Sequence, residues 1–176
     1  SFSGDGKLTI PLNGDDYCYA IKLNSVGNII LAGSSKNNNL NVFSVLMLNS
    51  SGVLESTFGD AGKKLIQMGR YNDAAKAIAL QADGKILLAG NSSNGKEYNA
   101  AIVRLTAMGQ LDNSFDSDGI AIISLTGSDE VVNAAALQDD GKLLIAGKQK
   151  TTSESFSYSI MVMRIQTAPA LDIAVT

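Results

Sequence analysis

Histidine and tryptophan are absent from this chain of 176 residues, which has only two prolines and a single cysteine, Cys18. Without histidine, neither a Ser-His-Asp triad, nor a Cys-His pair, nor a His-ligated metal centre can form. One cysteine excludes both an internal disulfide and a cysteine-cluster zinc site. We therefore expect no catalytic residue, no metal and no cofactor, and predict that the protein is not an enzyme.

Basic residues are also few, with 14 Lys and Arg against 17 Asp and Glu, a net charge of −3 and a pI near 4.8. This balance argues against nucleic acid or an anionic membrane surface as the main partner. No apolar run approaches the ~20 residues that a membrane-spanning helix needs, so we expect no membrane insertion. Hydrophobic residues make up 45% of the chain and charged residues 18%, which favours a folded core over disorder.

Three copies of one unit follow each other along the chain, and such repeats determine the fold. Each copy has a turn glycine, and these recur every 57 residues: Gly27, Gly84 and Gly141. An apolar run ending in Ala-Gly follows each turn, and a phenylalanine recurs upstream: Phe2, Phe58 and Phe115. We place the units at about 1–56, 57–113 and 114–166, and regard 167–176 as a C-terminal extension or the start of a following domain.

Each unit is predicted to contain four short strands, because glycine or asparagine interrupts the apolar runs too often for helices. The strands are expected at 17–23, 28–33 and 42–49 with 63–68; at 74–80, 85–90 and 98–106 with 120–125; and at 131–137, 142–147 and 158–166. A four-stranded meander repeated at this period is typical of a β-propeller blade, whereas β-helix coils, the alternative, are usually shorter. The predicted fold is therefore an all-β propeller of four-stranded antiparallel blades.

The second unit reads ALQADGKILLAG from residue 79, then IVRL, then GQLDNSFD and DGI. This sequence resembles the delta-60 repeat found in bacterial β-propeller proteins. The first unit departs from the pattern at Val26, Met47 and 54–55, and the third matches it only up to Arg164. The resemblance implies a propeller in a bacterial protein that is extracellular or on the cell surface, with no established general activity.

Three blades cannot close a ring, because propellers have four to eight. The outer faces of the first and last sheets would then be bare. Residues 7–12 match the fourth strand of a missing blade, and 171–175 are a doubtful fourth strand for the third unit. Three explanations stay open: further blades from the same chain, a second copy that completes a six-bladed ring, or an open stack against another protein.

Features present in every unit are interpreted as scaffold, since a ligand site rarely needs three copies. The phenylalanines are expected between blades, and Arg104 and Arg164 in ion pairs with carboxylates. Cys18 takes the position of Ala75 and Val132 and is expected to be a small buried residue.

A carboxylate also recurs eleven residues before each turn glycine: Asp16, Asp73 and Glu130. These side chains either bond to the backbone of the entry turn or form a ring of oxygen ligands for a hard cation.

Function is expected where the units differ, because binding usually lies in variable loops on a fixed scaffold. Two connections vary and should emerge on one face: the entry to the first strand (13–16, 70–73 and 127–130) and the loop between the second and third strands (34–40, 91–97 and 148–156). The candidate binding residues in these connections are Arg70, Tyr71, Lys96, Glu97, Lys148 and Lys150.

The sequence thus predicts a non-catalytic binding or scaffold module that recognises protein or glycan through one loop face. A purely structural spacer, or a subunit of a larger assembly, is the alternative. A propeller hydrolase or lyase is less well supported: the neighbouring carboxylates Asp15 and Asp16, or Asp129 and Glu130, allow acid–base chemistry, but no distinctive partner accompanies them.

Overall fold

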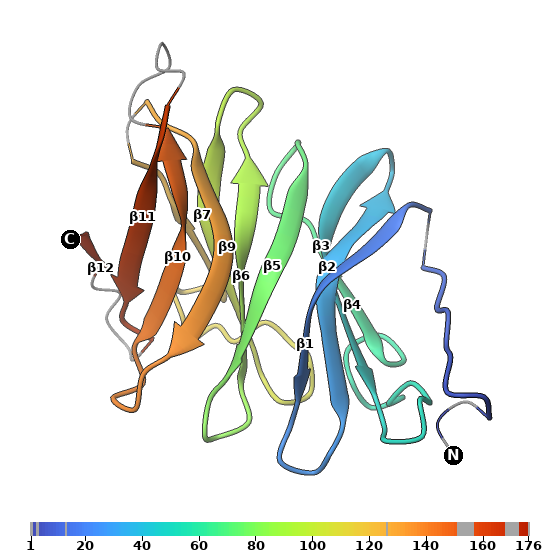
Figure 1. Cartoon of the computed structure of the whole chain (residues 1–176). Helices are drawn as coiled ribbons and strands as arrows, with labels where there is room; N and C mark the ends of the chain where they lie inside the picture. The colour runs from blue at the N-terminus through green and yellow to red at the C-terminus, as the bar shows by residue number, and fades with distance from the viewer. Residues whose placement is uncertain are drawn as a thin grey trace.

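The computed structural model describes residues 2, 4–12, 14–125, 127–150, 157–167 and 173–175. The regular elements of this part of the chain are all β-strands, and each strand pairs antiparallel with the next to form three four-stranded sheets (Figure 1). We name these sheets blades 1, 2 and 3. Blade 1 contains β1 (Asp16–Leu23), β2 (Ile29–Asn37), β3 (Leu40–Leu48) and β4 (Lys63–Ile66). Blade 2 contains β5 (Asp73–Leu80), β6 (Ile86–Ser93), β7 (Tyr98–Leu105) and β8 (Ile120–Ile123). Blade 3 contains β9 (Glu130–Leu137), β10 (Leu143–Lys150), β11 (Tyr158–Ile165) and β12 (Ile173–Val175).

The three blades stand side by side as a fan, with β5 in contact with both β1 and β9 (Figure 1). The copies therefore spread around an axis and do not coil along one, which confirms the predicted all-β meander and excludes the β-helix. Among the described residues no sheet closes on itself. Blades 1 and 3 form the two ends of the fan.

Tight turns join the first and second strands of each blade at the lower end of the fan in Figure 1. Their glycines have φ angles of 84°, 84° and 82°, in the left-handed region that glycine adopts without strain: Gly27, Gly84 and Gly141. The N–H of each glycine donates to the carbonyl three residues earlier, at 3.0, 3.0 and 2.9 Å. The predicted turns are confirmed.

The Ala-Gly pair of each unit lies opposite a β-bulge in the first strand. The pairing register skips one residue of β1, β5 and β9, and the bulged residues are Tyr19, Lys76 and Asn133. The glycines of these pairs are Gly33, Gly90 and Gly147. A Cβ atom on any of them would lie only 1.7 to 2.0 Å from a carbonyl oxygen of the bulged strand. Only glycine therefore allows the bulge, and a bulge re-aims the side chain it carries.

Two hydrophobic cores fill the spaces between neighbouring blades. One joins Phe43 and Val45 of blade 1 to Leu88 and Val103 of blade 2, and a second core joins the other face of blade 2 to blade 3. Phe58 and Phe115 are buried members of these cores, as predicted for residues that pack between blades. Phe2 lies against Gly52 of blade 1 but is only half-buried.

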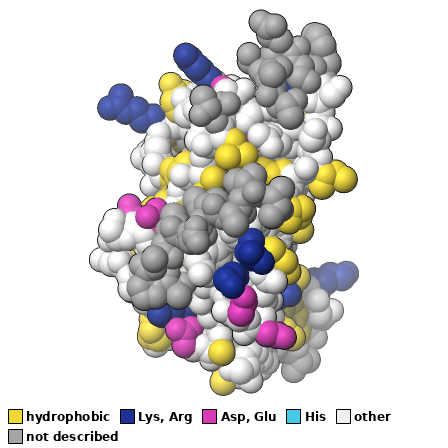
Figure 2. Space-filling model, turned by 90° about the vertical axis from the view of Figure 1, so that its left-hand side faces the viewer, with side chains coloured by type: hydrophobic (Ala, Val, Ile, Leu, Met, Phe, Trp, Pro, Cys, Tyr) yellow, Lys and Arg dark blue, Asp and Glu magenta, His cyan; other side chains and the backbone are white. Residues whose placement is uncertain are grey.

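The outer faces of blades 1 and 3 have no neighbouring blade among the described residues, and many of their apolar side chains are exposed. Ile21 on β1 is 63% exposed, whereas Ile78 at the same position of β5 is 2% exposed, and Ile160 on β11 is 89% exposed. Hydrophobic side chains are visible on the blade 3 side of the molecule in Figure 2. The prediction that Cys18 is buried is wrong: its equivalents Ala75 and Val132 are covered by a preceding blade, but nothing among the described residues covers Cys18 fully, so it is exposed.

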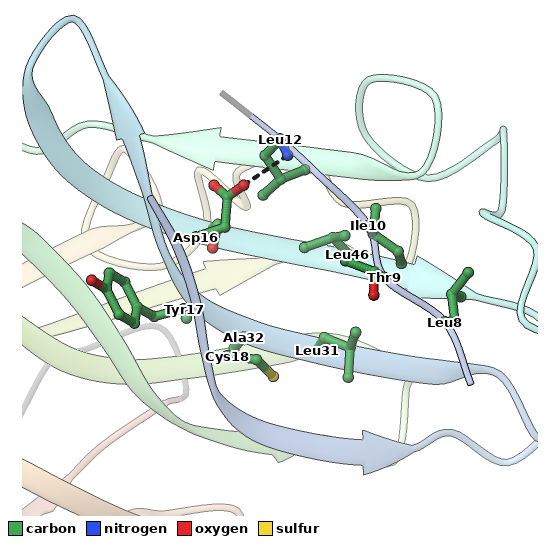
Figure 3. A pocket seen from close by; sticks show the side chains of 12 residues that line it. Leu8, Thr9, Ile10, Leu12, Asp16, Tyr17, Cys18, Leu31, Ala32 and Leu46 are labelled. Atoms are coloured by element: carbon green, nitrogen blue, oxygen red, sulfur yellow. Dashed lines mark hydrogen bonds between the residues drawn. The ribbon is translucent and has the colours of Figure 1, made fainter. Parts of the chain in front are cut away.

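Two end segments differ from a simple fourth strand. Residues 7–12 run over the face of blade 1 (Figure 3) and form no ladder with a described strand. Residues 173–175 form β12, which pairs with 163–165 of β11, so part of the doubtful fourth strand completes blade 3. Residues 168–172 and 176 lie outside the described residues, and a domain beyond 167 stays a prediction.

Candidate functional site

The entry turn of each blade is organised by the recurring carboxylate. Asp16 Oδ2 accepts the Leu12 N–H at 2.8 Å, and Asp16 Oδ1 accepts the Ser35 hydroxyl at 2.6 Å. Asp73 Oδ2 accepts the Met68 N–H at 3.1 Å. Glu130 accepts the hydroxyl of Ser128. The carboxylates therefore shape the entry turns, which confirms the structural role predicted for them.

Burial raises the pKa of both Asp73 and Glu130, although hydrogen bonds oppose the shift. Ser92 and Met68 lower the pKa of Asp73 in part. Among the described residues no three His, Cys, Asp or Glu side chains gather closely enough to hold a metal ion. The three carboxylates thus lie apart, one at each entry turn, and do not form one ligand ring.

Backbone hydrogen bonds join each entry turn to the end of the second strand in the same blade. The N–H groups of Lys36, Ser93 and Lys150 donate to the carbonyls of Asp15, Asn72 and Asp129 at 3.2, 3.0 and 3.0 Å. Side chains link adjacent blades in the same region: Asn41 N–H donates to Asn72 Oδ1, and Tyr98 N–H to Asp129 Oδ1, both at 2.9 Å. The two variable connections therefore emerge on one continuous face, as predicted. We call it the loop face; it is the upper end of the fan in Figure 1.

All five tyrosines of the chain belong to the loop face. They lie near the start of a first strand, in an entry turn, or at the start of a third strand: Tyr17, Tyr19, Tyr71, Tyr98 and Tyr158. Their exposed fractions fall between 45% and 53%. The phenylalanines Phe43, Phe58 and Phe115 are fully buried instead. The five phenols thus gather at one end of the fan, whereas these three phenylalanines lie in the cores.

A pocket of about 270 Å³ opens on the loop face between blades 1 and 2. Its lining is mainly polar and aromatic: Tyr19, Ser34, Asn41, Asn72, Asp73, Ala74, Lys76, Asn91, Tyr98 and Val131. Lys76 Nζ lies 3.3 Å from the centre of the Tyr19 ring, a cation–π contact. Asp73 is 1% exposed, and its Oδ1 has no hydrogen-bond partner among the described residues. This oxygen is itself buried, and the carboxylate is held by the Met68 N–H, so Asp73 supports the pocket wall from behind.

The six predicted binding residues lie on the loop face but do not line this pocket. Arg70 and Tyr71 are exposed in the entry turn of blade 2, and the Tyr71 ring packs on Gly95. Lys96 is exposed and Glu97 half-buried in the short connection between β6 and β7. Their role in binding stays a prediction.

The predicted loops between second and third strands are shorter than expected. Lys148 and Lys150 belong to β10, and Lys148 Nζ lies 4.0 Å from the centre of the Tyr158 ring. In blade 1 the connection is the pair Asn38 and Asn39, with φ of 48° and 68°, a tight hairpin turn. The strands continue past the Ala-Gly pairs because the hairpin partner supplies their hydrogen bonds. Residues 151–156 lie outside the described residues.

Sequence reasoning missed the pocket residues Tyr19 and Lys76, which occupy bulge positions. A bulge breaks the alternation of inward and outward side chains, so a pattern of period two cannot place them. A signal was present in the second and third units, where Lys76 and Asn133 are polar residues within runs that are otherwise small and apolar after the entry carboxylate.

Arg104 forms a buried ion cluster at the opposite end of the joint between blades 2 and 3. Its Nε lies 2.8 Å from Asp112 Oδ2, and Lys85 Nζ lies 3.3 Å from the same oxygen. Arg104 also donates to the Ser114 hydroxyl at 2.8 Å and to the Thr167 carbonyl of blade 3. The predicted structural ion pair is therefore confirmed for Arg104. Arg164 is exposed, and the position equivalent to Asp112 in blade 3 lies outside the described residues.

The fan of four-stranded blades places the chain among propeller-type repeat proteins. A family model described as "Domain of unknown function (DUF5122) beta-propeller" matches residues 81–115, from the turn of blade 2 to Phe115. A second model, "Haemagglutinin repeat", matches residues 1–56 and 116–168. Because these two segments span more than half of the chain, the chain belongs to the haemagglutinin-repeat family. This membership points to a secreted or cell-surface protein.

None of the curated proteins matches the chain. The described part of the chain contains no helix that could serve as a membrane span.

Proposed function

We propose that this chain is a non-catalytic binding module of a secreted or cell-surface bacterial protein, and that it recognises a glycan or protein ligand through the loop face. The observation that carries the proposal is the gathering of all five tyrosines, each about half-exposed, at one end of the fan. Tyrosine offers a rigid apolar ring and a polar hydroxyl, and it is enriched where proteins bind ligands. The haemagglutinin-repeat and β-propeller matches, with the delta-60 resemblance, support a surface location.

The pocket between blades 1 and 2 favours a glycan. Its amide and hydroxyl groups, Ser34, Asn41 and Asn91 among them, can donate to and accept from sugar hydroxyls. The Tyr19 and Tyr98 rings add flat apolar surfaces of the kind that a sugar ring contacts. A pocket with mixed apolar and convergent polar groups is typical of small-ligand sites.

A glycan array followed by titration calorimetry on the hits tests the proposal. We expect Tyr98→Ala and Tyr19→Ala each to weaken binding about tenfold or more, because each removes a ring from the pocket wall and tenfold corresponds to about 1.4 kcal/mol. Met108→Ala is the control, since Met108 is about as exposed but lies in the connection between β7 and β8 and does not line the pocket. Binding that persists in both pocket variants contradicts the site, and an empty array together with an empty pull-down contradicts the function.

A structural spacer is the second candidate, and one observation favours it. The recurring residues all serve contacts within or between blades, as the phenylalanines, the turn glycines and the entry carboxylates show. This candidate is supported if the chain binds no glycan on the array and yet assembles with further blades.

Hydrolase or lyase chemistry has weaker support. Asp15 pairs with Lys36 at 3.6 Å, and Asp129 accepts the Tyr98 N–H. Asp16 and Glu130 hold their entry turns through hydrogen bonds. Because all four carboxylates already have such structural partners, we propose binding without catalysis.

A further inference from the structure

A pocket of about 250 Å³ lies on the outer face of blade 1, beneath the segment 7–12 (Figure 3). Leu8, Ile10 and Leu12 form one wall, and Cys18, Leu31, Ser44 and Leu46 of blade 1 form the floor. This pocket is separate from the one on the loop face. Most of its lining residues are apolar.

The floor of this pocket repeats one side of an interface that already exists inside the chain. Cys18, Leu31, Ser44 and Leu46 are the blade 1 equivalents of four blade 2 residues: Ala75, Leu88, Ala101 and Val103. In blade 2 these four residues pack against Phe43 and Val45 of blade 1, in one buried core. The pocket is therefore the place where a preceding blade would insert two side chains of its third strand.

The matching side chains stand on the opposite end of the fan. Ile160 and Val162 occupy the positions in β11 that Phe43 and Val45 occupy in β3. Phe43 and Val45 are both fully buried, whereas Ile160 is 89% and Val162 42% exposed. Blade 3 therefore carries the other half of the same interface, without a partner among the described residues (the side shown in Figure 2).

Backbone pairing is also incomplete at both ends of the fan: blade 1 has a segment without a ladder, and blade 3 has a strand edge without a partner among the described residues. Residues 7–10 correspond to β4. The Leu12 N–H that follows them donates to Asp16, just as the Met68 N–H that follows β4 donates to Asp73. β4 pairs with 43–46 of β3, and β8 with 100–103 of β7. Residues 7–10 have no such ladder among the described residues, and β12 pairs with β11 only at 163–165. Among the described residues, no strand pairs with the edge of β11 from Tyr158 to Val162.

We propose that two copies of this chain dock head to tail, with Ile160 and Val162 of one copy in the pocket of the other and with residues 7–10 added to the edge of its β11. A polar contact would accompany them, because Asp15 stands where Asn72 and Asp129 receive an N–H from the preceding blade. A second copy is the occupant that fits, since both complementary halves belong to one chain. Head-to-tail contacts close a ring when the rotation allows, and two copies give six blades, within the usual four to eight.

Native mass spectrometry and light scattering across a concentration series test the proposal. The expected species is a dimer, twice the 18.4 kDa chain. A monomer at the highest concentration, or an open-ended series of larger species, overturns it. Neither outcome depends on ligand binding at the loop face, so the proposed function is tested separately.

Substitutions on the two faces give a sharper test. Ile21→Asp and Ile160→Asp each place a charge on one exposed docking face and should each abolish the dimer without unfolding the chain. Ile122→Asp is the matched control, since Ile122 is an exposed isoleucine of the middle blade. Mixing the two variants should restore a dimer through the one interface in which both faces are intact. A mixture that stays monomeric, or a control that also dissociates, contradicts the proposal.

Cys18 provides an independent probe because it is the only cysteine and lies on the pocket floor. We expect a maleimide reagent to modify Cys18 at least about tenfold more slowly in the wild-type protein at dimer-forming concentration than in the Ile160→Asp variant. Equal rates would place Cys18 outside any interface and overturn the docking geometry.

Discussion

Blades 1 and 2 have the same strands in the same register, yet they differ in what surrounds them. Ile78 of β5 is buried and Ile21 of β1 is exposed, although both project from the same position. Blade 2 has a neighbouring blade on each face, and among the described residues blade 1 has a neighbouring blade on one face only. In a stack of repeats, the burial of a residue is thus set by the adjacent unit as much as by the residue itself.

The joints between blades also differ in polarity. Blade 2 meets blade 3 through the charged cluster of Arg104, Asp112 and Lys85, with the Thr167 carbonyl as an additional acceptor. At the equivalent place blade 1 has Met47 and Asn28, whose Nδ2 lies 3.7 Å from the methionine Sδ, beside Glu55 in the position of Asp112. The same backbone therefore accepts either two cations or two uncharged residues next to the recurring carboxylate.

The largest expected effect is a difference in stability between variants of the buried Ile78 and the exposed Ile21. Ile78→Ala should lower the free energy of unfolding by about 4 kcal/mol, because it leaves a cavity between two blades. Ile21→Ala should change it by no more than about 0.5 kcal/mol in the monomer, because the side chain is largely in water. Urea denaturation at low protein concentration, where the monomer predominates, measures both. Equal losses would show that the neighbouring blade does not determine burial.

Replacing the charged joint by the neutral one should have a smaller effect. Arg104→Met introduces the residue of blade 1, and we expect a loss of about 3 kcal/mol because Asp112 loses a buried partner. The double variant with Asp112→Asn should recover part of this loss, since no uncompensated charge remains. Thermal and urea unfolding of the two variants provide the comparison. A double variant less stable than Arg104→Met alone would show that the aspartate has another role.

The smallest expected effect is a difference in acid stability. Burial alone would raise the pKa of Asp112, but hydrogen bonds from Ser114 and Lys85 and the charge of Arg104 lower it to about 2. Its ordinary value is 3.8, so the folded state holds this carboxylate ionised. The stabilisation is complete above about pH 4 and is lost as the pH falls towards 2.

The free energy of unfolding should therefore fall less between pH 5 and pH 2 in the Asp112→Asn variant than in the wild type, as measured by urea unfolding at several pH values. Asp73 and Glu130 act in the opposite direction, because burial raises their pKa and their ionisation disfavours the folded state. An Asp112→Asn variant with an unchanged acid slope would assign the pH dependence to other groups.

The repeat made most of the fold predictable from the sequence. Gly84 and its two equivalents locate the turns, and the apolar runs around them locate the strands to within a few residues. The lengths of the hairpins were underestimated because polar strand ends such as Ser34 and Asn91 look like loops, although cross-strand hydrogen bonds keep them in the sheet. Cys18 was misplaced for another reason: its burial depends on a neighbour that its own repeat does not contain.

The loop face was predictable, but its pocket was not. Alternation of connections in a meander places variable loops at one end of the sheets, and the structure has them there. Tyr19 and Lys76 reach the pocket from bulges, and Asn41 reaches it from the adjacent blade. Such positions depend on three-dimensional register and contacts between units, which one sequence does not reveal.

The bulge opposite each Ala-Gly pair has a consequence for how such proteins can diversify. It fixes the backbone of the first strand through one glycine, while the residue it carries is free to be tyrosine, lysine or asparagine. Exchange of the bulge residue alone therefore changes the surface chemistry of one blade while the glycine keeps the strand in place. Recognition can diversify by this route without any change in the packing between blades.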